Sequence, residues 1–331
     1  MRITRNLSAI SAALCCSLAA ALTPTTSALA ADKDYPQKPV MLVVSYPAGG
    51  SVDAAARILQ EPLGKALGQP IVVENRGGAG GTIATRHVAT SKPDGYTVLI
   101  TLSSHTINPA VYDNLPFDTQ TDFKPVSLVA SAPQVLVAHP SFKPSTLKEL
   151  LEYAEQSPDP VPYGSAGIGS PSHIAGELLS QKANTTKLMH VPYRGGGPAT
   201  VDVVSGQIPL LWVSLPSVAS FIKSGDLKAI AVSTKDRTPI MPDIPAASET
   251  IDDFNVDSWY AMFVPVKTPS EVVDTLYEAI VIASKDPKVN EALAAQGAVA
   301  VGTTPAELGE IVKKEIADWK VLAEQANIKI K

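Results

Sequence analysis

The sequence predicts an α/β protein of two domains, each built on a doubly wound sheet. Its 331 residues exceed what one hydrophobic core usually organises. Apolar runs of strand length alternate with amphipathic helical patterns, an order typical of parallel strands joined by crossover helices. A unit of strand end, Gly/Ser-rich loop and helix start occupies Tyr46–Asp53 and recurs at Tyr163–His173. The same unit therefore opens each half of the chain.

Composition excludes several classes of protein. The chain is 45% hydrophobic and 18% charged, which excludes a disordered protein. Its 28 prolines and 21 glycines indicate many short elements. With 27 Lys and Arg against 32 Asp and Glu, the net charge is −5, and no basic cluster overrides it. We therefore expect no nucleic-acid partner.

Residues 1–30 have the features of a secretory signal peptide. Arg2 and Arg5 precede the apolar stretch Leu7–Leu22, and Ala28-Leu29-Ala30 is a cleavage signature, so we expect cleavage near Ala30/Ala31. The stretch is too short and too rich in serine for a membrane anchor, and Leu14 before Cys15 fits a lipoprotein signal poorly. Both cysteines lie here, so the exported protein is expected to fold without disulfides.

The first domain is predicted at residues 31–126 plus 257–331. Apolar runs, helical spacing and turn residues predict its elements: strands at Val40–Val44, Ile71–Val73 and Tyr96–Leu102, a helix from Ser51 or Asp53 to Leu67 ended by Gly68, and a helix over Ile83–Val88. Trp259–Val264 is expected to return the chain to this domain, before a helical tail over Ser270–Trp319.

The second domain is predicted at residues 127–256. Ser127–Val137 is expected to be one strand that crosses between the domains. The remaining predicted elements are a helix over Leu147–Ala154, a strand at Val161–Tyr163, a helix from Pro171, and strands at Ile208–Val213 and Leu227–Val232.

The two recurring loops favour anion binding. A helix N-terminus carries free N–H groups and partial positive charge, and small loop residues let a carboxylate approach the backbone. One such loop alone is more often only a turn; two equivalent loops favour a site. The candidate residues are Tyr46, Ala48, Gly49, Gly50 and Ser51 in the first loop and Tyr163, Ser165, Ala166, Gly167 and Ser170 in the second.

Other candidates lie beside these loops or at strand ends. Asp53 is expected either to stabilise the first helical turn or to anchor waters or a ligand amino group. His173 either lines the cleft or packs and caps its helix. Arg194 offers a guanidinium fork to a second carboxylate or is a solvated surface side chain. Ser103 and Ser104 follow one strand, and Ser214 ends another, where open α/β sheets bind ligands.

Motifs of enzymes, cofactors and metals are incomplete or missing. Gly167-x-Gly169-x-x-Ser172 lacks the third glycine of a dinucleotide site, and Gly77–Gly81 lacks the Lys that follows a P-loop. No G-x-S-x-G elbow occurs, and the five histidines are dispersed. We therefore expect no catalytic residue, no cofactor and no metal.

Several motifs together resemble the Bug family, the extracytoplasmic receptors of tripartite tricarboxylate transporters. They are Val72-Val73-Glu74-Asn75-Arg76-x-Gly78-Ala79-Gly80-Gly81, Pro93-Asp94-Gly95-Tyr96-Thr97, Tyr163-Gly164-Ser165-x-Gly167-x-Gly169, Val191-Pro192-Tyr193-Arg194-Gly195 and Pro242-Asp243-Ile244-Pro245. The resemblance extends from about Tyr35 to Trp319. Two positions depart from the family pattern: Gly77 stands where proline is usual, and Pro209 where a polar residue is common.

This resemblance implies a periplasmic-binding-protein clamshell of two α/β domains joined by crossover strands. It implies a small carboxylate ligand held between the two loops, with Asp53 helping to organise waters. The implied partners are the permease subunits of a tripartite membrane transporter, the implied location is the periplasm, and a monomer suits a hinge-bending receptor. Tyr46 and Tyr163 are expected either to flank a flat ligand or to pack their loops.

Three functional hypotheses follow. The leading one is a non-catalytic receptor that delivers a mono- or dicarboxylate to a permease. The second is a receptor that signals through a membrane sensor. The third is an exported enzyme that uses the glycine loops to bind a nucleotide.

Overall fold

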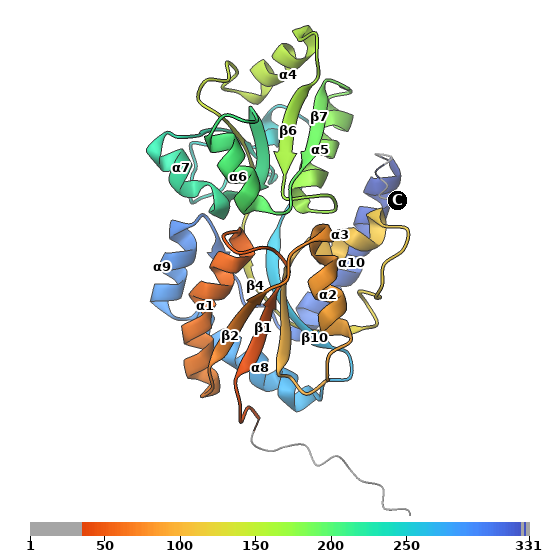
Figure 1. Ribbon diagram of the computed structural model, residues 1–331, viewed down its shortest axis with the longest axis vertical. Helices are drawn as coiled ribbons and strands as arrows, with labels where there is room; N and C mark the ends of the chain where they lie inside the picture. The colour runs from red at the N-terminus through yellow and green to blue at the C-terminus, as the bar shows by residue number, and fades with distance from the viewer. Residues whose placement is uncertain (1–34, 326–327, 329–331) are drawn as a thin grey trace, which may run out of the picture. The chain divides into compact units, whose positions relative to one another are not determined.

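The computed structural model describes residues 35–325 and 328, and from Tyr35 onward the chain forms one compact unit. The predicted signal peptide lies outside the described residues. The unit contains two mixed sheets, which Figure 1 shows one above the other. We call each sheet with its helices a lobe. Within the described part, every helix is too short or too polar to cross a bilayer.

The first lobe has a six-stranded sheet in the order β11-β4-β10-β3-β1-β2. Strands β1, β2 and β3 are parallel, whereas β10 is antiparallel to both of its neighbours. The strands are β1 (Val40–Val44), β2 (Ile71–Asn75), β3 (Thr97–Leu102), β4 (Phe123–Ser131), β10 (Trp259–Pro265) and β11 (Val299–Ala300).

Helices cover both faces of this sheet. One core contains side chains of α1, α8 and α9, and the core on the opposite face contains side chains of α2 and α10. The helices are α1 (Ser51–Leu67), α2 (Thr82–Ala89), α3 (Ser104–Val111), α8 (Ser270–Ser284), α9 (Pro287–Ala295) and α10 (Pro305–Gln325). A 3-10 turn, η1 (Ala79–Gly81), precedes α2.

The second lobe has a five-stranded sheet in the order β7-β6-β8-β5-β9. Strand β6 is parallel to β7 and β8, and β5 is antiparallel to β8 and β9. The strands are β5 (Gln134–Ala138), β6 (Val161–Ser165), β7 (Leu188–Pro192), β8 (Leu210–Ser214) and β9 (Lys228–Val232). The helical elements are α4 (Leu147–Gln156), α5 (Pro171–Lys182), α6 (Gly196–Val204), η2 (Leu215–Ser217), α7 (Ala219–Ser224) and η3 (Ala247–Glu249).

Two adjacent segments join the lobes. The prediction of one crossing strand over 127–137 is wrong, because β4 ends at Ser131, Ala132-Pro133 interrupts it, and β5 starts at Gln134. Residues 127–131 pair with β10 and therefore belong to the first sheet. The prediction that the chain returns at Trp259 is confirmed. The Ala132 N–H donates to the Ser258 carbonyl (2.9 Å), so the outgoing and returning segments lie side by side.

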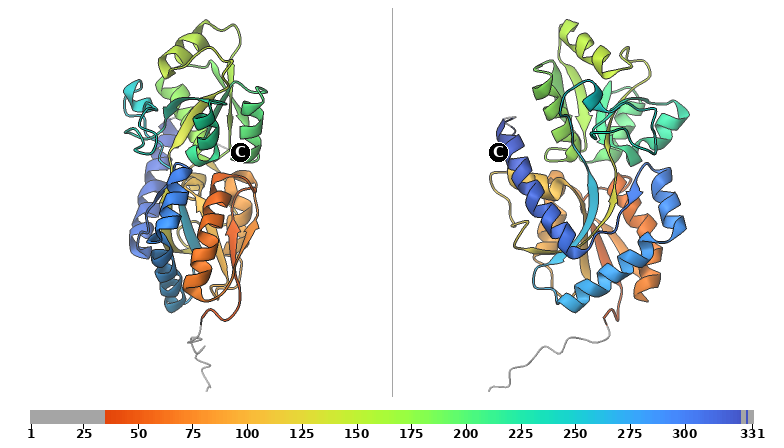
Figure 2. Two further views of the ribbon diagram at one scale, coloured as in Figure 1. Left: turned by 90° about the vertical axis from the view of Figure 1, so that its left-hand side faces the viewer. Right: turned by 180° about the vertical axis from the view of Figure 1, so that it is seen from behind.

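Helix α10 also bridges the lobes. Its buried side chains Leu308, Val312 and Ile316 belong to a core of the first lobe, whereas Ala323 belongs to a core of the second. The right-hand view of Figure 2 shows this helix crossing the near face of the first lobe and ending beside the second. Helix α3 of the first lobe likewise contributes Ile107 to the core of the second. The two lobes therefore share packing on one side of the molecule.

Tyr163 and Gly176 fix the position of α5 on the second sheet. The Tyr163 ring is 2% exposed, and a Cβ added at Gly176 would overlap it. Only a residue without a side chain lets the helix approach this closely. Because α5 starts at the second loop, this packing also fixes where that loop lies.

We predict that Gly176→Ala lowers the free energy of unfolding by about 1–3 kcal/mol, since the added methyl group must displace the buried ring. The matched control is Gly309→Ala in α10, where the nearest atom to the added Cβ is 3.7 Å away. There the greater helix propensity of alanine raises stability by up to about 1 kcal/mol. Urea denaturation of both variants checks the prediction, and equal effects would contradict it.

Candidate functional site

The carboxyl ends of strands from both sheets meet where the lobes face each other, and two adjoining cavities lie there. The inner cavity, of about 10 Å³, is lined by Tyr46, Gly50, Ser51, Val52 and Leu102 of the first lobe and by Gln134, Ala166, Pro171, Ser172, Gly196, Val213, Ser214 and Ser217 of the second. The outer cavity, of about 520 Å³, is lined by Tyr46, Gly77, Gly78, Ala79, Gly80, Ile83, Tyr112, Ala166, Gly167, Ile168, Pro192, Tyr193 and Arg194. Tyr46 and Ala166 belong to both, so the cavities are adjacent.

Three helices begin at the inner cavity. Ser51 starts α1, Pro171 starts α5 and Gly196 starts α6, and all three residues line it. The first N–H groups of a helix have no partner within the helix, and the helix dipole places partial positive charge there. The inner cavity is therefore suited to a negatively charged group.

Several buried hydroxyl groups at the inner cavity or near its lining residues have no hydrogen-bond partner. Among the described residues, no partner is found for the side-chain oxygens of Tyr46, Ser103, Ser104, Ser217 and Tyr260. The Tyr46 hydroxyl lies close to that of Ser104, and the Tyr260 hydroxyl close to those of Ser51 and Ser214, without hydrogen bonds of good geometry. A buried polar group without a partner costs about 1–3 kcal/mol. Such a group favours a ligand that supplies the missing hydrogen bond.

Both tyrosine hydroxyls are donors at neutral pH. Burial raises the pKa of Tyr46 well above its usual value, and burial raises that of Tyr260 to about 12 despite nearby Ser51 and Ser214. Each therefore keeps its proton and can donate it to a carboxylate oxygen.

A polar network braces the first loop. Asp53 accepts hydrogen bonds from the Gly49 N–H (3.0 Å) and from Arg57 Nε (3.1 Å). Burial opposes ionisation of Asp53, but these two donors and Asn75 together lower its pKa. Asn75 in turn donates to the Tyr46 carbonyl (3.1 Å). Of the two roles expected for Asp53, this geometry favours the structural one.

The backbone N–H groups of the second loop are largely bonded within the loop. Those of Ala166, Gly167 and Gly169 donate to Ser172 Oγ, Ser165 Oγ and His173 Nδ1 at 2.9, 3.1 and 3.3 Å. The Ser170 N–H donates to the carbonyl of Gly167 (3.1 Å), and its hydroxyl caps α5. These four amides are therefore occupied, unlike the free amides that the sequence suggested. The loop positions a helix start and does not itself offer those donors.

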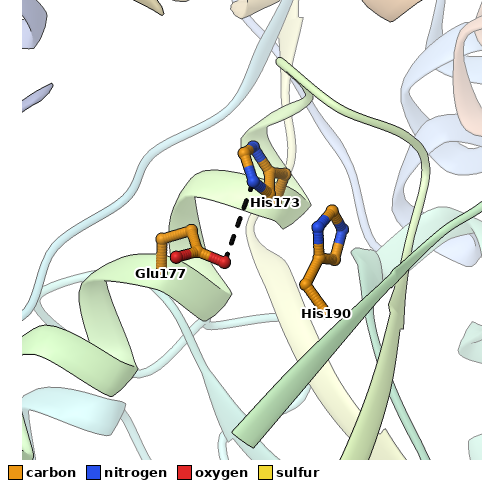
Figure 3. Close-up of side chains that lie close together, drawn as sticks. All are labelled: His173, Glu177 and His190. Carbon is orange, nitrogen blue, oxygen red and sulfur yellow. Dashed lines mark ion pairs between the residues drawn. The ribbon is translucent and has the colours of Figure 1, made fainter. Parts of the chain in front are cut away.

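A cluster of two histidines and a glutamate lies next to this loop; Figure 3 shows its side chains. Ligand-type atoms of His173, Glu177 and His190 lie within 4.8 Å of one another, so the fold brings together two histidines that the sequence shows as dispersed. His190 Nε2 lies 2.6 Å from Ser165 Oγ, and the two imidazole rings stack at 4.3 Å. His173 Nδ1 accepts the Gly169 N–H (3.3 Å), so one ring nitrogen of each histidine contacts the second loop, and the cluster helps to hold that loop in place.

The predicted site residues fall into two groups. The cavity walls contain Tyr46, Gly50, Ser51, Ala166, Gly167, Arg194 and Ser214. The others do not line either cavity: Ala48, Gly49, Asp53, Ser103, Ser104, Tyr163, Ser165, Ser170 and His173. Of these, Ser104 still places a hydroxyl beside Tyr46. Tyr163 donates to Glu177 Oε1 (2.8 Å) and stacks on His190, so it packs in the core.

Several residues that line the cavities or lie beside them were missed by the sequence analysis. Gln134, at the start of β5, donates from Nε2 to Ser214 Oγ (2.9 Å). Tyr260 lies on the returning strand, and Tyr112 follows α3. The sequence offered little to mark them: Gln134 follows Pro133, and Tyr260 lies within a buried strand. The Gly77–Gly81 stretch was examined as a phosphate loop, yet four of its five residues form one wall of the outer cavity.

The lobes touch along the cleft through glycines. A Cβ added at Gly80 would lie 2.6 Å from the Ile168 carbonyl oxygen in the opposite lobe, and one at Gly195 would lie 3.0 Å from Pro47. Asn108 of α3 donates to the Gly80 carbonyl (3.1 Å), and its Oδ1 faces Gly169 across the same contact. This arrangement brings the two lobes into contact without large side chains between them.

Comparison with known proteins gives consistent matches. The family described as "Tripartite tricarboxylate transporter family receptor" matches residues 55–328. BugT of Bordetella pertussis is 35% identical, with 90% of this chain and 92% of BugT covered. A structure of an R. palustris protein with adipate superposes with a TM-score of 0.85 at 31% identity, covering 89% of this chain and 99% of that one. The structure of MatC from Rhodopseudomonas palustris with bound malate superposes with a TM-score of 0.83 at 32% identity, covering 87% of this chain and 99% of that one.

The histidine cluster predicts a dependence of stability on pH. Burial lowers the pKa of His173 to about 3, with a contribution from His190, and burial lowers that of His190 to about 4. Between about pH 6.5 and pH 4 the unfolded chain therefore binds more protons than the folded one. Stability should fall as pH falls through this window.

His173→Gln should flatten this slope in part, because one of the histidines held neutral is gone while His190 and the buried His105 remain. The slope of stability against pH is measured by thermal unfolding at pH 7, 6 and 5, monitored by circular dichroism. His87→Gln on α2 is the control outside the cluster. A wild-type slope in the His173 variant would contradict the assignment.

Proposed function

The chain belongs to the tripartite tricarboxylate transporter receptor family, and from that premise we propose that it captures a small carboxylate between its lobes and delivers it to a tripartite-type membrane permease. The family is one of substrate-binding receptors and not of enzymes. The proposal includes export to the periplasm through residues 1–30 and action as a monomer.

One observation carries the ligand class. Three helix N-termini line one small cavity together with Tyr46 and Ser217, whose buried hydroxyls have no partner among the described residues, and the Tyr260 hydroxyl lies beside the lining residues Ser51 and Ser214. A carboxylate satisfies both, because its oxygens accept several hydrogen bonds and its charge is favoured by the helix dipoles. The structures of relatives with adipate and with malate support the same class.

The size of the inner cavity bears on how binding occurs. About 10 Å³ is the space of a single water molecule, so a carboxylate enters only when the facing loops separate. The two segments that join the lobes, one between β4 and β5 and one just before β10, are the expected hinges. Among the described residues, no strand of one sheet pairs with a strand of the other there. We therefore propose that ligand enters an opened cleft and that closure buries its charged end.

The first prediction is that organic acids, and not nucleotides, raise the melting temperature of the purified protein. A ligand that binds only the folded state stabilises it by an amount set by its concentration relative to Kd. A thermal-shift series with succinate, adipate, citrate, benzoate, ATP and NAD tests this. A shift with a nucleotide and none with any acid would reject the receptor hypothesis in favour of the enzyme one.

The second prediction concerns closure. Gly80→Ala should weaken carboxylate binding about tenfold, because its methyl group meets the Ile168 carbonyl across the lobe contact. Gly225→Ala is the control: its φ of +83° is positive like the +60° of Gly80, but nothing lies within 4 Å of the added Cβ. Calorimetric titration compares the two. Equal affinities in both variants would show that this contact does not form in the ligand-bound state.

A further inference from the structure

We infer that the ligand is a dicarboxylate whose two acid groups are separated by an apolar chain longer than that of a four-carbon acid, and that Arg194 binds its outer carboxylate. This inference rests on the proposed function and specifies its ligand. It follows from the size, lining and charge of the outer cavity.

The outer cavity is where the body of the ligand must lie. A carboxylate held at the inner cavity, beside Tyr46 and Ala166, has its chain directed into the outer cavity because these two residues are shared by both walls. The outer cavity measures about 520 Å³, within the range of small-molecule sites. A four-carbon acid leaves much of this volume to water.

The walls of the outer cavity suit a hydrocarbon chain. Tyr46, Tyr112 and Tyr193 line it, together with Ile83 and Ile168. The two isoleucines are 53% and 39% exposed, unusually open positions for such side chains. The Tyr193 hydroxyl is already bonded to Asp202 (2.7 Å), so it is not a free donor to the ligand. An apolar spacer would cover surface that is otherwise left in contact with water.

Arg194 is the single charged residue in the cavity wall as the structure describes it. Among the described residues it forms no ion pair or side-chain hydrogen bond, whereas Arg57, Arg76 and Arg237 each bind a carboxylate. A guanidinium offers two parallel N–H donors that match the two oxygens of a carboxylate. An unpaired Arg in the wall of the outer cavity and unpaired hydroxyls at the inner cavity therefore correspond to a ligand with two acid groups.

A set of three ligands and two variants tests the inference by calorimetric titration. Adipate carries both acid groups, hexanoate has the same length with one, and succinate is the shorter diacid. In the wild type we expect adipate to bind more tightly than either. Arg194→Gln should weaken adipate binding five- to tenfold and change hexanoate binding by less than twofold. Unchanged hexanoate binding also shows that the variant is folded.

Arg86→Gln is the control for net charge, because Arg86 is an exposed residue of α2 that does not line either cavity. It should leave all three affinities as in the wild type. The inference is overturned if the wild type binds hexanoate as tightly as adipate, or binds succinate more tightly than adipate. It is also overturned if Arg194→Gln changes the affinities for adipate and hexanoate by the same factor. Those results leave carboxylate capture intact. A wild-type protein that binds no carboxylate at all would instead overturn the proposed function itself.

Discussion

The fold leaves hydrogen-bonding groups buried and unpartnered at the meeting of its two lobes, and the account of function depends on that fact. Tyr46, Ser104 and Tyr260 bring hydroxyls to a place from which water is largely excluded. Each unpaired group costs free energy in the free protein. A carboxylate that accepts hydrogen bonds from several of them offsets this cost, whereas an apolar molecule does not. The proposed preference for an acid therefore follows from groups that the fold itself places in the cleft.

The two Gly/Ser-rich loops have a different role from the one their glycines suggest. Several of their amides are bonded within the loop region: the Gly49 N–H donates to Asp53 in the first loop, and the Gly169 N–H donates to His173 in the second. These bonds hold each loop in one shape, so that the helix that follows begins at the cleft. The helices α1, α5 and α6 then present their N-terminal groups in fixed positions. Preorganisation of this kind lowers the entropic cost of binding.

An element is predicted well from the sequence where its own residues show a clear pattern of apolar, polar and turn-forming side chains. Strand β1 and helix α1 are predicted closely, because an unbroken apolar run and a regular apolar spacing ended by Gly68 leave little choice. Helix α3 is missed because it contains Pro109 and is buried on nearly all sides, so it has no polar face to reveal its period. Helix α6 is missed because it starts with Gly196, Gly197 and Pro198, a sequence that is typical of a turn. The strand break at Pro133 was overlooked within a long apolar stretch.

The site is predicted less completely than the fold, since a cavity depends on residues brought together from distant segments. Sequence reasoning selected both loops and Arg194 as candidates, whereas Gln134 and Tyr260 carry no local mark of function. The most direct test is a crystal structure of the protein with a bound dicarboxylate. The account predicts carboxylate oxygens within hydrogen-bond distance of Tyr46 and the first N–H groups of α1, with the lobes closed over them. Electron density that places the acid away from both, with only water at those groups, would contradict it.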